Sequence, residues 1–220
     1  MKKILRAFLV FLVFVPTKII FPVKVYGKNN LPKKQTYVAI SNHMHWLDIF
    51  YIWFYLPKFS CFLAKKEFKK KPLTSLILRI LGAIFIDRQK PDLKAVKQSV
   101  KALKKSSLVI FPEGTRNKND ENLQSIKGGA AMIAAKADTQ IVPIVIGHRP
   151  KAFKKNFIYI SAPVFLPVTS ADRFNSDALK ICTDILSVEM TYAKDCAEKI
   201  KVNKMTDLKK QQMLTESLSG

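Results

Sequence analysis

The chain has 220 residues, of which 48% are hydrophobic and 25% are charged. This length suits one domain with at most a small appendage, and the hydrophobic share excludes a disordered chain. Lysine and arginine number 38 against 16 acidic residues, a formal net charge of +22. We therefore expect an anionic partner: a nucleic acid, an anionic membrane, or a phosphorylated or acidic ligand. Three cysteines without a Cys-x-x-Cys pair disfavour a disulfide scaffold or structural zinc site and are typical of a reducing cytoplasm.

The first 22 residues are apolar and basic. Nine consecutive apolar residues at positions 7–15 follow Lys2, Lys3 and Arg6 and precede Pro16. The run is marginal for a bilayer crossing, which needs about 20 apolar residues, and no small-residue cleavage site follows, as a signal peptide requires. A buried core helix is the remaining alternative. We expect residues 1–22 to form a helical segment lying in one leaflet, with its basic ends at the lipid head groups.

Short apolar runs and amphipathic stretches alternate along the rest of the chain. In chain order, the patterns predict a strand at 24–27, a strand at 37–40, a helix at 48–56, a strand at 59–64, a helix at 73–81, a strand at 83–86, a helix at 92–105, a strand at 108–111, a helix at 128–137, strands at 141–146, 157–160 and 164–166, and a long helix at 178–201. This alternation predicts an α/β fold around a largely parallel sheet. We expect the domain at 23–202 and a polar C-terminal tail at 203–220. Ligands of such sheets usually bind at the carboxyl ends of the strands.

The first group of candidate functional residues has the sequence NHMHWLD at positions 42–48, directly after a predicted strand. A loop there can return the Asp48 carboxylate to the His43 ring, where it would fix the tautomer and stabilise the imidazolium. The other ring nitrogen could then accept a proton from a hydroxyl group, while the Asn42 amide braces the turn. Two alternatives remain from these residues alone: a metal site that also uses His45, and a purely structural turn.

Two further groups follow predicted strands. The sequence GAIFIDR at 82–88 ends in Arg88, whose guanidinium matches phosphate oxygens, with a salt bridge to a neighbouring acid as the alternative. The sequence FPEGTR at 111–116 joins an acid, a hydroxyl and a base at a glycine turn, where backbone N–H groups, Thr115 and Arg116 could form a phosphate pocket. The signatures of a P-loop and of a serine nucleophile are both missing.

The fourth group, VPIVI at 142–146, indicates a buried strand and carries no chemistry of its own. Before it, Lys127 precedes a predicted helix, whose N–H groups could attract an anion together with the lysine.

These four groups, in this order, resemble the motifs of the glycerolipid acyltransferase family, and the likeness runs from about residue 23 to residue 146. His-x4-Asp alone occurs often by chance, whereas its combination with FPEGTR at this separation is specific. The chain is most similar to the bacterial members that acylate lysophosphatidic acid. The resemblance implies an α/β acyltransferase domain with a largely parallel central sheet and an N-terminal membrane-docking helical element.

The resemblance also implies a role for each matching residue. His43 would be the general base and Asp48 its partner, while His45 stands where the family commonly has a small or polar residue and is expected to shape the rim. The glycerol phosphate of the acceptor would be surrounded by residues of the second and third groups and by a lysine after the third strand: Lys65, Arg88, Glu113, Gly114, Thr115 and Arg116.

The implied reaction moves an acyl chain from a thioester of acyl carrier protein or coenzyme A to the sn-2 hydroxyl of 1-acyl-sn-glycerol 3-phosphate, giving phosphatidic acid. It needs no metal and no cofactor. The expected partners are the lysophosphatidic acid acceptor, the thioester donor and an anionic membrane surface at the cytoplasmic face. Alternatives are the same chemistry on glycerol 3-phosphate or another lysolipid, and, more distantly, a basic nucleic-acid- or membrane-binding protein. No nucleic acid is expected, because the chain lacks a recognisable nucleic-acid-binding motif.

Overall fold

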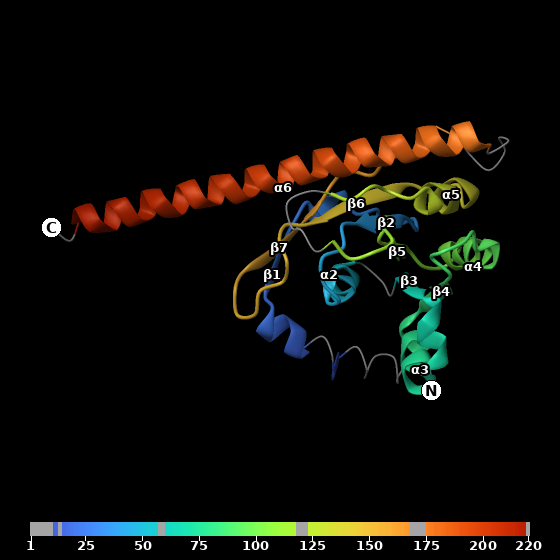
Figure 1. The fold of residues 1–220 in the computed structure, drawn as a ribbon. Coiled ribbons are helices and arrows are strands. Elements are labelled where there is room, and N and C mark those ends of the chain that lie inside the picture. The colour runs from blue at the N-terminus through green and yellow to red at the C-terminus, as the bar shows by residue number, and fades with distance from the viewer. Residues whose placement is uncertain (1–10, 13–14, 57–59, 118–122, 168–174, 219–220) are drawn as a thin grey trace.

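A seven-stranded sheet forms the centre of the computed structural model, with helices on both of its faces (Figure 1). The structure describes residues 11–12, 15–56, 60–117, 123–167 and 175–218. The strands are β1 (Val23–Tyr26), β2 (Val38–Ser41), β3 (Cys61–Lys65), β4 (Ala83–Ile86), β5 (Leu108–Ile110), β6 (Ile141–Ile146) and β7 (Asn156–Ile160).

The strand order β1-β7-β6-β2-β5-β3-β4 contains five consecutive parallel strands, from β6 to β4. Strand β7 pairs antiparallel with β6 and parallel with β1. The predicted α/β fold with a largely parallel sheet is therefore confirmed. Because the five strands run in the same direction, their carboxyl ends share one edge of the sheet, where α/β proteins bind ligands.

Two layers of helices cover the sheet. Helices α2 (Asp48–Tyr55) and α3 (Pro72–Leu81) contribute Trp53 and Leu81 to the hydrophobic core on one face. On the other face, Val96, Ile133 and Leu186 come from α4 (Leu93–Leu103), α5 (Gly129–Lys136) and α6 (Ser176–Leu218). Two short 3-10 helices, η1 (Lys28–Asn30) and η2 (Lys66–Lys70), complete the described elements.

The ends of the helices follow from local sequence. Pro72 begins α3, where its missing N–H would have no helical partner, and Gly82 ends the helix with a φ of 99°. Asp92 caps α4, because its side chain accepts a hydrogen bond from the Ala95 N–H at 2.9 Å. These caps place β4 and its carboxyl end between two well-defined helices.

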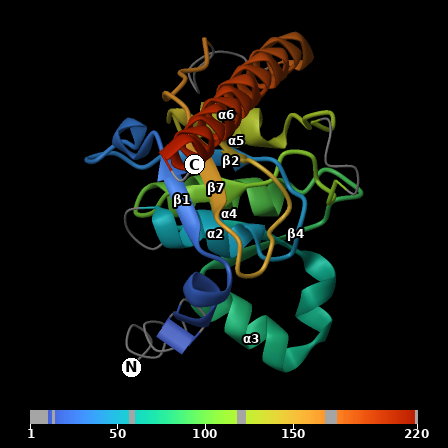
Figure 2. The same ribbon diagram turned by 90° about the vertical axis from the view of Figure 1, so that its left-hand side faces the viewer.

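The N-terminal segment is described only in part. Residues 15–20 are helical, and the Phe21 ring then contacts the Tyr51 ring of α2 at 6.3 Å between centroids. Most of the membrane-docking helix predicted at 1–22 lies outside the described residues, so it stays a prediction. Figures 1 and 2 place residues 15–20 and α3 at the same end of the domain, opposite α6. In the part of the chain that the structure describes, none of the helices has both the length and the apolar character needed to cross a bilayer.

Two elements differ from the sequence predictions. Helix α6 continues to Leu218 instead of ending at residue 201, and its C-terminal part extends beyond the sheet (Figure 1). The stretch after Val202 contains neither Pro nor Gly before position 220 and is rich in good helix formers, so nothing ends the helix there. The strand predicted at 164–166 is wrong: Val164 forms only an isolated bridge to Ile141. The three residues lie between Pro163 and Pro167, which disfavour continuing a strand in either direction.

Candidate active site

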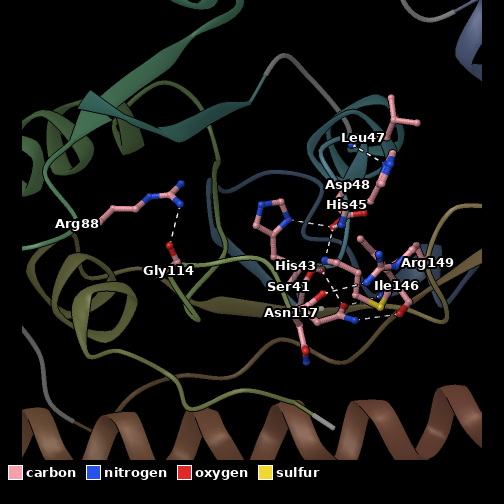
Figure 3. Close-up of polar contacts among 12 residues, drawn as sticks. Ser41, His43, His45, Leu47, Asp48, Arg88, Gly114, Asn117, Ile146 and Arg149 are labelled. Carbon is pink, nitrogen blue, oxygen red and sulfur yellow. Dashed lines mark hydrogen bonds and ion pairs between the residues drawn. The ribbon is translucent and has the colours of Figure 1, made fainter. Parts of the chain in front are cut away.

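The predicted functional groups gather at the carboxyl edge of the parallel strands. The loop at 42–48 follows β2, the loop at 111–117 follows β5, and Arg88 lies just after β4. Figure 3 shows that these segments approach one another around the His43 ring, with Arg88 and Gly114 on one side and Arg149 on the other. The sheet topology therefore brings together segments that are far apart in the sequence.

His43 and Asp48 form the predicted pair. The His43 Nδ1 lies 2.9 Å from the Asp48 Oδ2, and the Asp48 side chain is fully buried. The same oxygen accepts hydrogen bonds from the backbone N–H groups of Met44 and His45, both at 2.6 Å. A carboxylate held in this way fixes the Nδ1–H tautomer of His43 and leaves Nε2 able to accept a proton.

Residues of the loop at 111–117 hold His43 in place. The Phe111 ring stacks on the His43 ring at 4.2 Å between centroids, with an angle of 20° between the planes. The Asn117 N–H donates to the His43 carbonyl at 2.6 Å, and Glu113 accepts a hydrogen bond from the His43 backbone N–H. The backbone and the ring of His43 are therefore both positioned by the segment that follows β5.

Asn42 joins the start of the His43 loop to β6. Its Nδ2 donates to the Ile146 carbonyl at 3.0 Å, and its Oδ1 accepts from the Ile146 N–H at 2.8 Å. The amide thus continues the β2–β6 ladder beyond the end of the strand backbone. The prediction that Asn42 braces the turn is wrong in its partner: the amide holds the neighbouring strand β6, because that strand leaves the Ile146 N–H and carbonyl facing the end of β2.

Glu113 is buried under the histidine, and its Oε2 finds no hydrogen-bond partner among the described residues. Burial raises the pKa of Glu113 from 4.5 to about 7; the His43 N–H opposes this increase, and the negative charge of Asp48 adds to it. The carboxyl group therefore titrates near neutral pH. The contact of Glu113 with an acceptor stays a prediction, and the geometry favours a role in positioning His43.

The titration of Glu113 has a consequence for stability. As the pH rises from about 4.5 to about 7, the unfolded chain loses the proton of Glu113 while the folded chain retains it, so the free energy of unfolding falls. The fall is at most about 3 kcal/mol. We expect Glu113→Gln to remove this decrease, because glutamine does not ionise. Urea unfolding of both proteins at several pH values in this window measures the effect, and parallel stability curves would contradict the assignment.

Arg88 is directed toward the third group and not toward its neighbouring acid. Its Nη1 donates to the Gly114 carbonyl at 2.8 Å, whereas Asp87 forms an ion pair with Lys66 at 2.8 Å. Gly114 has a φ of 75°, and a Cβ at this position would meet the Lys127 Nζ at 3.1 Å. Glycine is therefore favoured by the backbone conformation, and any larger residue would also displace the end of the Lys127 side chain slightly.

The other residues predicted to bind the acceptor are more exposed. Thr115 and Arg116 lie on the surface of the loop after β5, and the Thr115 hydroxyl donates to the Gln124 Oε1 at 3.1 Å. Lys65 is exposed at the end of β3. Its role in binding phosphate stays a prediction.

Two residues near the site, Arg149 and Asn117, were missed by the sequence analysis. Arg149 follows β6, and its Nη2 donates to the carbonyl of Asn117 at 3.3 Å. Burial lowers the pKa of His45; Asp48 opposes this effect, and the positive charges of Arg149 and Arg116 add to it. Arg149 could have been found from the rule that residues after neighbouring parallel strands lie close together. Nothing in the sequence spacing indicates the contacts of Asn117.

A cavity of about 340 Å³ opens beside Arg88 and Gly114, on the α4 and α5 side of the sheet. Arg88, Lys90 and Lys127 line it together with Asp87, Asp92 and apolar side chains that include Ile86, Val96, Ile110, Met132, Ile133 and Leu179. The combination of cations with hydrocarbon suits a ligand that has both an anionic and an apolar part. Among the described residues, no three His, Cys, Asp or Glu side chains gather as metal ligands would. That the reaction needs no metal stays a prediction.

The α/β domain holds a histidine–carboxylate pair at the carboxyl ends of its parallel strands, an arrangement that enzymes can use for general base chemistry. Comparison with known families gives the finer assignment. The model of the Acyltransferase family matches residues 22–147, more than half of the chain. The chain therefore belongs to the Acyltransferase family.

Curated relatives carry the name 1-acyl-sn-glycerol-3-phosphate acyltransferase. The protein of Streptococcus pneumoniae is 39% identical over 123 residues, which are 54% of this chain and 45% of the relative. The protein of Helicobacter pylori is 40% identical over 121 residues, 53% of this chain and 50% of the relative. The chain thus spans about half the length of the curated relatives it matches.

A solved structure shares the fold. The crystal structure of the 1-acyl-sn-glycerophosphate (LPA) acyltransferase PlsC from Thermotoga maritima superposes with a TM-score of 0.61 at 23% sequence identity. The match covers 91% of this chain and 98% of that protein.

Proposed function

We propose that the protein transfers an acyl chain from an acyl thioester to the sn-2 hydroxyl of 1-acyl-sn-glycerol 3-phosphate, giving phosphatidic acid. The observation that carries the proposal is the His43–Asp48 pair, joined at 2.9 Å at the end of β2. Family membership and the names of the curated relatives support this choice of reaction. The donor is a thioester of acyl carrier protein or of coenzyme A.

In the proposed mechanism, His43 first accepts a proton from the acceptor and later gives it to the leaving group. The His43 Nε2 removes the proton from the acceptor hydroxyl while that oxygen attacks the thioester carbonyl carbon. Asp48 stabilises the imidazolium through Nδ1–H. The C–S bond then breaks, the new ester bond remains, and the leaving thiolate takes the proton from His43. Neither a metal ion nor a covalent enzyme intermediate takes part.

The acceptor phosphate is proposed to lie near Arg88 and Arg116, with Lys127 and Arg149 adding positive charge around it. Guanidinium groups suit this role because their geometry matches that of phosphate oxygens. Arg88 already donates to the Gly114 carbonyl, so it also shapes the loop, whereas Arg116 is exposed and available to a ligand. Arg116 is therefore the better residue with which to test phosphate binding.

Arg116→Ala should raise the KM for the acceptor by about 10- to 100-fold, because charged hydrogen bonds contribute about 1.5–3 kcal/mol. Arg116→Lys keeps the positive charge but lacks the planar guanidinium. Its KM for the acceptor should therefore lie between that of the unaltered protein and that of Arg116→Ala. Turnover at saturating acceptor and the KM for the donor should change little. If only the donor KM changed, the phosphate would have to bind elsewhere.

The reaction itself is tested by acyl transfer with the purified protein in detergent. Lysophosphatidic acid is supplied with acyl carrier protein and coenzyme A thioesters in parallel, and glycerol 3-phosphate and other lysolipids are compared as acceptors. Phosphatidic acid formation that is lost in His43→Ala supports the proposal and identifies the donor. A product formed only from another acceptor would replace the substrate while keeping the mechanism.

The protein is further proposed to act at the cytoplasmic face of a membrane, with the segment at 1–22 in contact with lipid. The exposed side chains of Phe11, Leu12 and Ile19 support a lipid contact of this segment. The net charge of +22 would draw the protein to anionic lipids, to a phosphorylated acceptor and to an acidic donor.

A further inference from the structure

Helix α3 is apolar on more than one side. Six of its ten residues are Leu or Ile. Leu78 and Leu81 pack against the core, but Leu73 and Leu76 are 70% and 57% exposed. A helix that is hydrophobic all round is normally buried. Part of the apolar surface of α3 therefore has no cover within the described part of the domain.

A dense basic segment adjoins this surface. Positions 65–71 hold five lysines and one acidic residue, Glu67, and all of them are exposed. Phe68 is 41% exposed within the segment, while Lys69 lies over the Phe85 ring at 5.4 Å from its centroid. Lysines and exposed apolar side chains therefore occupy the same short stretch of surface.

The position of this surface connects it with the candidate active site. Helix η2 begins directly after β3 at the carboxyl edge of the sheet, and Lys66 of η2 pairs with Asp87, the residue before Arg88. Both ribbon views show α3 at the same end of the domain as residues 15–20, opposite α6 (Figures 1 and 2). Ile19 of that segment is also exposed.

We propose that η2 and α3 form a second lipid contact, which inserts into an anionic leaflet. This docking face comprises Phe68, Leu73 and Leu76 with Lys69, Lys70 and Lys71. An anionic leaflet supplies acyl chains for the apolar residues and negative head groups for the lysines. This lipid contact goes beyond the proposed reaction. It rests on the proposed function only in one respect, namely that docking would hold the site next to a lipid acceptor.

Insertion is tested with the full chain and vesicles of phosphatidylcholine and phosphatidylglycerol whose acyl chains carry bromine. Leu73→Trp places a fluorophore on the docking face, and Val188→Trp places one at a similarly exposed position, 67%, on α6. We expect bromine to quench the fluorescence added by Leu73→Trp and to leave that added by Val188→Trp unchanged. Equal quenching of the two, or vesicles that bind no protein, would overturn the proposal. The readout needs no catalysis, so it is separate from the proposed function.

The role of the lysines is tested by vesicle flotation. Lys70→Glu with Lys71→Glu should lower partitioning onto anionic vesicles by roughly fivefold for each lysine removed, and added salt should reduce the difference. The matched control, Lys97→Glu with Lys101→Glu, changes exposed lysines of α4 by the same charge. If partitioning stayed unchanged while the KM for an acyl carrier protein thioester rose, the lysines would bind an acidic protein and the lipid assignment would be wrong.

Discussion

His43→Ala should lower turnover by about 10²- to 10⁴-fold, the usual contribution of a positioned general base. The expected loss follows from geometry, because the ring has a carboxylate at 2.9 Å from Nδ1 and a stacked phenyl ring that fixes its plane. Among the described residues, His43 is the only histidine whose ring is hydrogen-bonded to a carboxylate side chain, so the substitution removes that pair. The assay is acyl transfer from the thioester donor under single-turnover and steady-state conditions.

The fold should survive this substitution. After loss of the imidazole, Asp48 still accepts two backbone N–H groups, so its buried charge keeps hydrogen-bond partners. His45→Ala is the matched control: it removes a histidine two positions away and leaves the His45 N–H that bonds to Asp48. We expect its turnover to stay within a few-fold of the unaltered protein. Equal losses in the two variants would mean that the loop, and not the His43 base, supports the reaction.

Much of this architecture could be predicted because local sequence determines it. The apolar run at 83–86 and the glycine before it specify β4, and the structure has the strand with the same bounds. The rule that parallel strands bring their carboxyl ends together predicts that the loops that carry His43, Arg88 and Gly114 share one edge of the sheet. Hydrophobic periodicity and turn residues were therefore enough to predict the sheet and the edge of the sheet at which the candidate site lies.

Long-range contacts could not be predicted from spacing. The bond from the Asn117 N–H to the His43 carbonyl joins loops after two different strands, and asparagine in a loop has no pattern that distinguishes it. The burial of Glu113 and its bond with the His43 N–H likewise join the loop after β5 to the loop after β2. For α3, periodicity predicted a helix, but an apolar pattern on several sides does not tell which side packs on the core.

The loop at 111–117 contacts His43 at three points. Phe111, Glu113 and Asn117 all contact His43, through the ring, the N–H and the carbonyl. Gly114 and Arg116 lie in the same loop, so the segment that positions His43, the proposed base, also presents the proposed phosphate ligand. A displacement of this loop would therefore alter both the proton transfer and the acceptor position.

Asp48→Asn should lower turnover by about 10²- to 10⁴-fold while retaining the loop. The hydrogen bonds of Asp48 converge on Oδ2, and its Oδ1 is buried without a partner among the described residues. An asparagine can therefore keep its oxygen at the Oδ2 position and put its amide nitrogen at the Oδ1 position. The backbone N–H bonds persist, and the loss is that of the negative charge that stabilises the imidazolium. Unfolding by urea, measured beside turnover, separates this effect from a general loss of stability.

A double-mutant cycle decides whether Asp48 acts through His43. If it does, Asp48→Asn should cost much less turnover in the His43→Ala background than alone, because the group it assists is already absent. The interaction energy would then be large, as it is for residues that work as one unit. If Asp48→Asn lowered turnover by the same factor in both backgrounds, Asp48 would only shape the loop. The acid–base pair would then reduce to His43 alone, and the buried carboxylate would serve as an acceptor for the N–H groups of Met44 and His45.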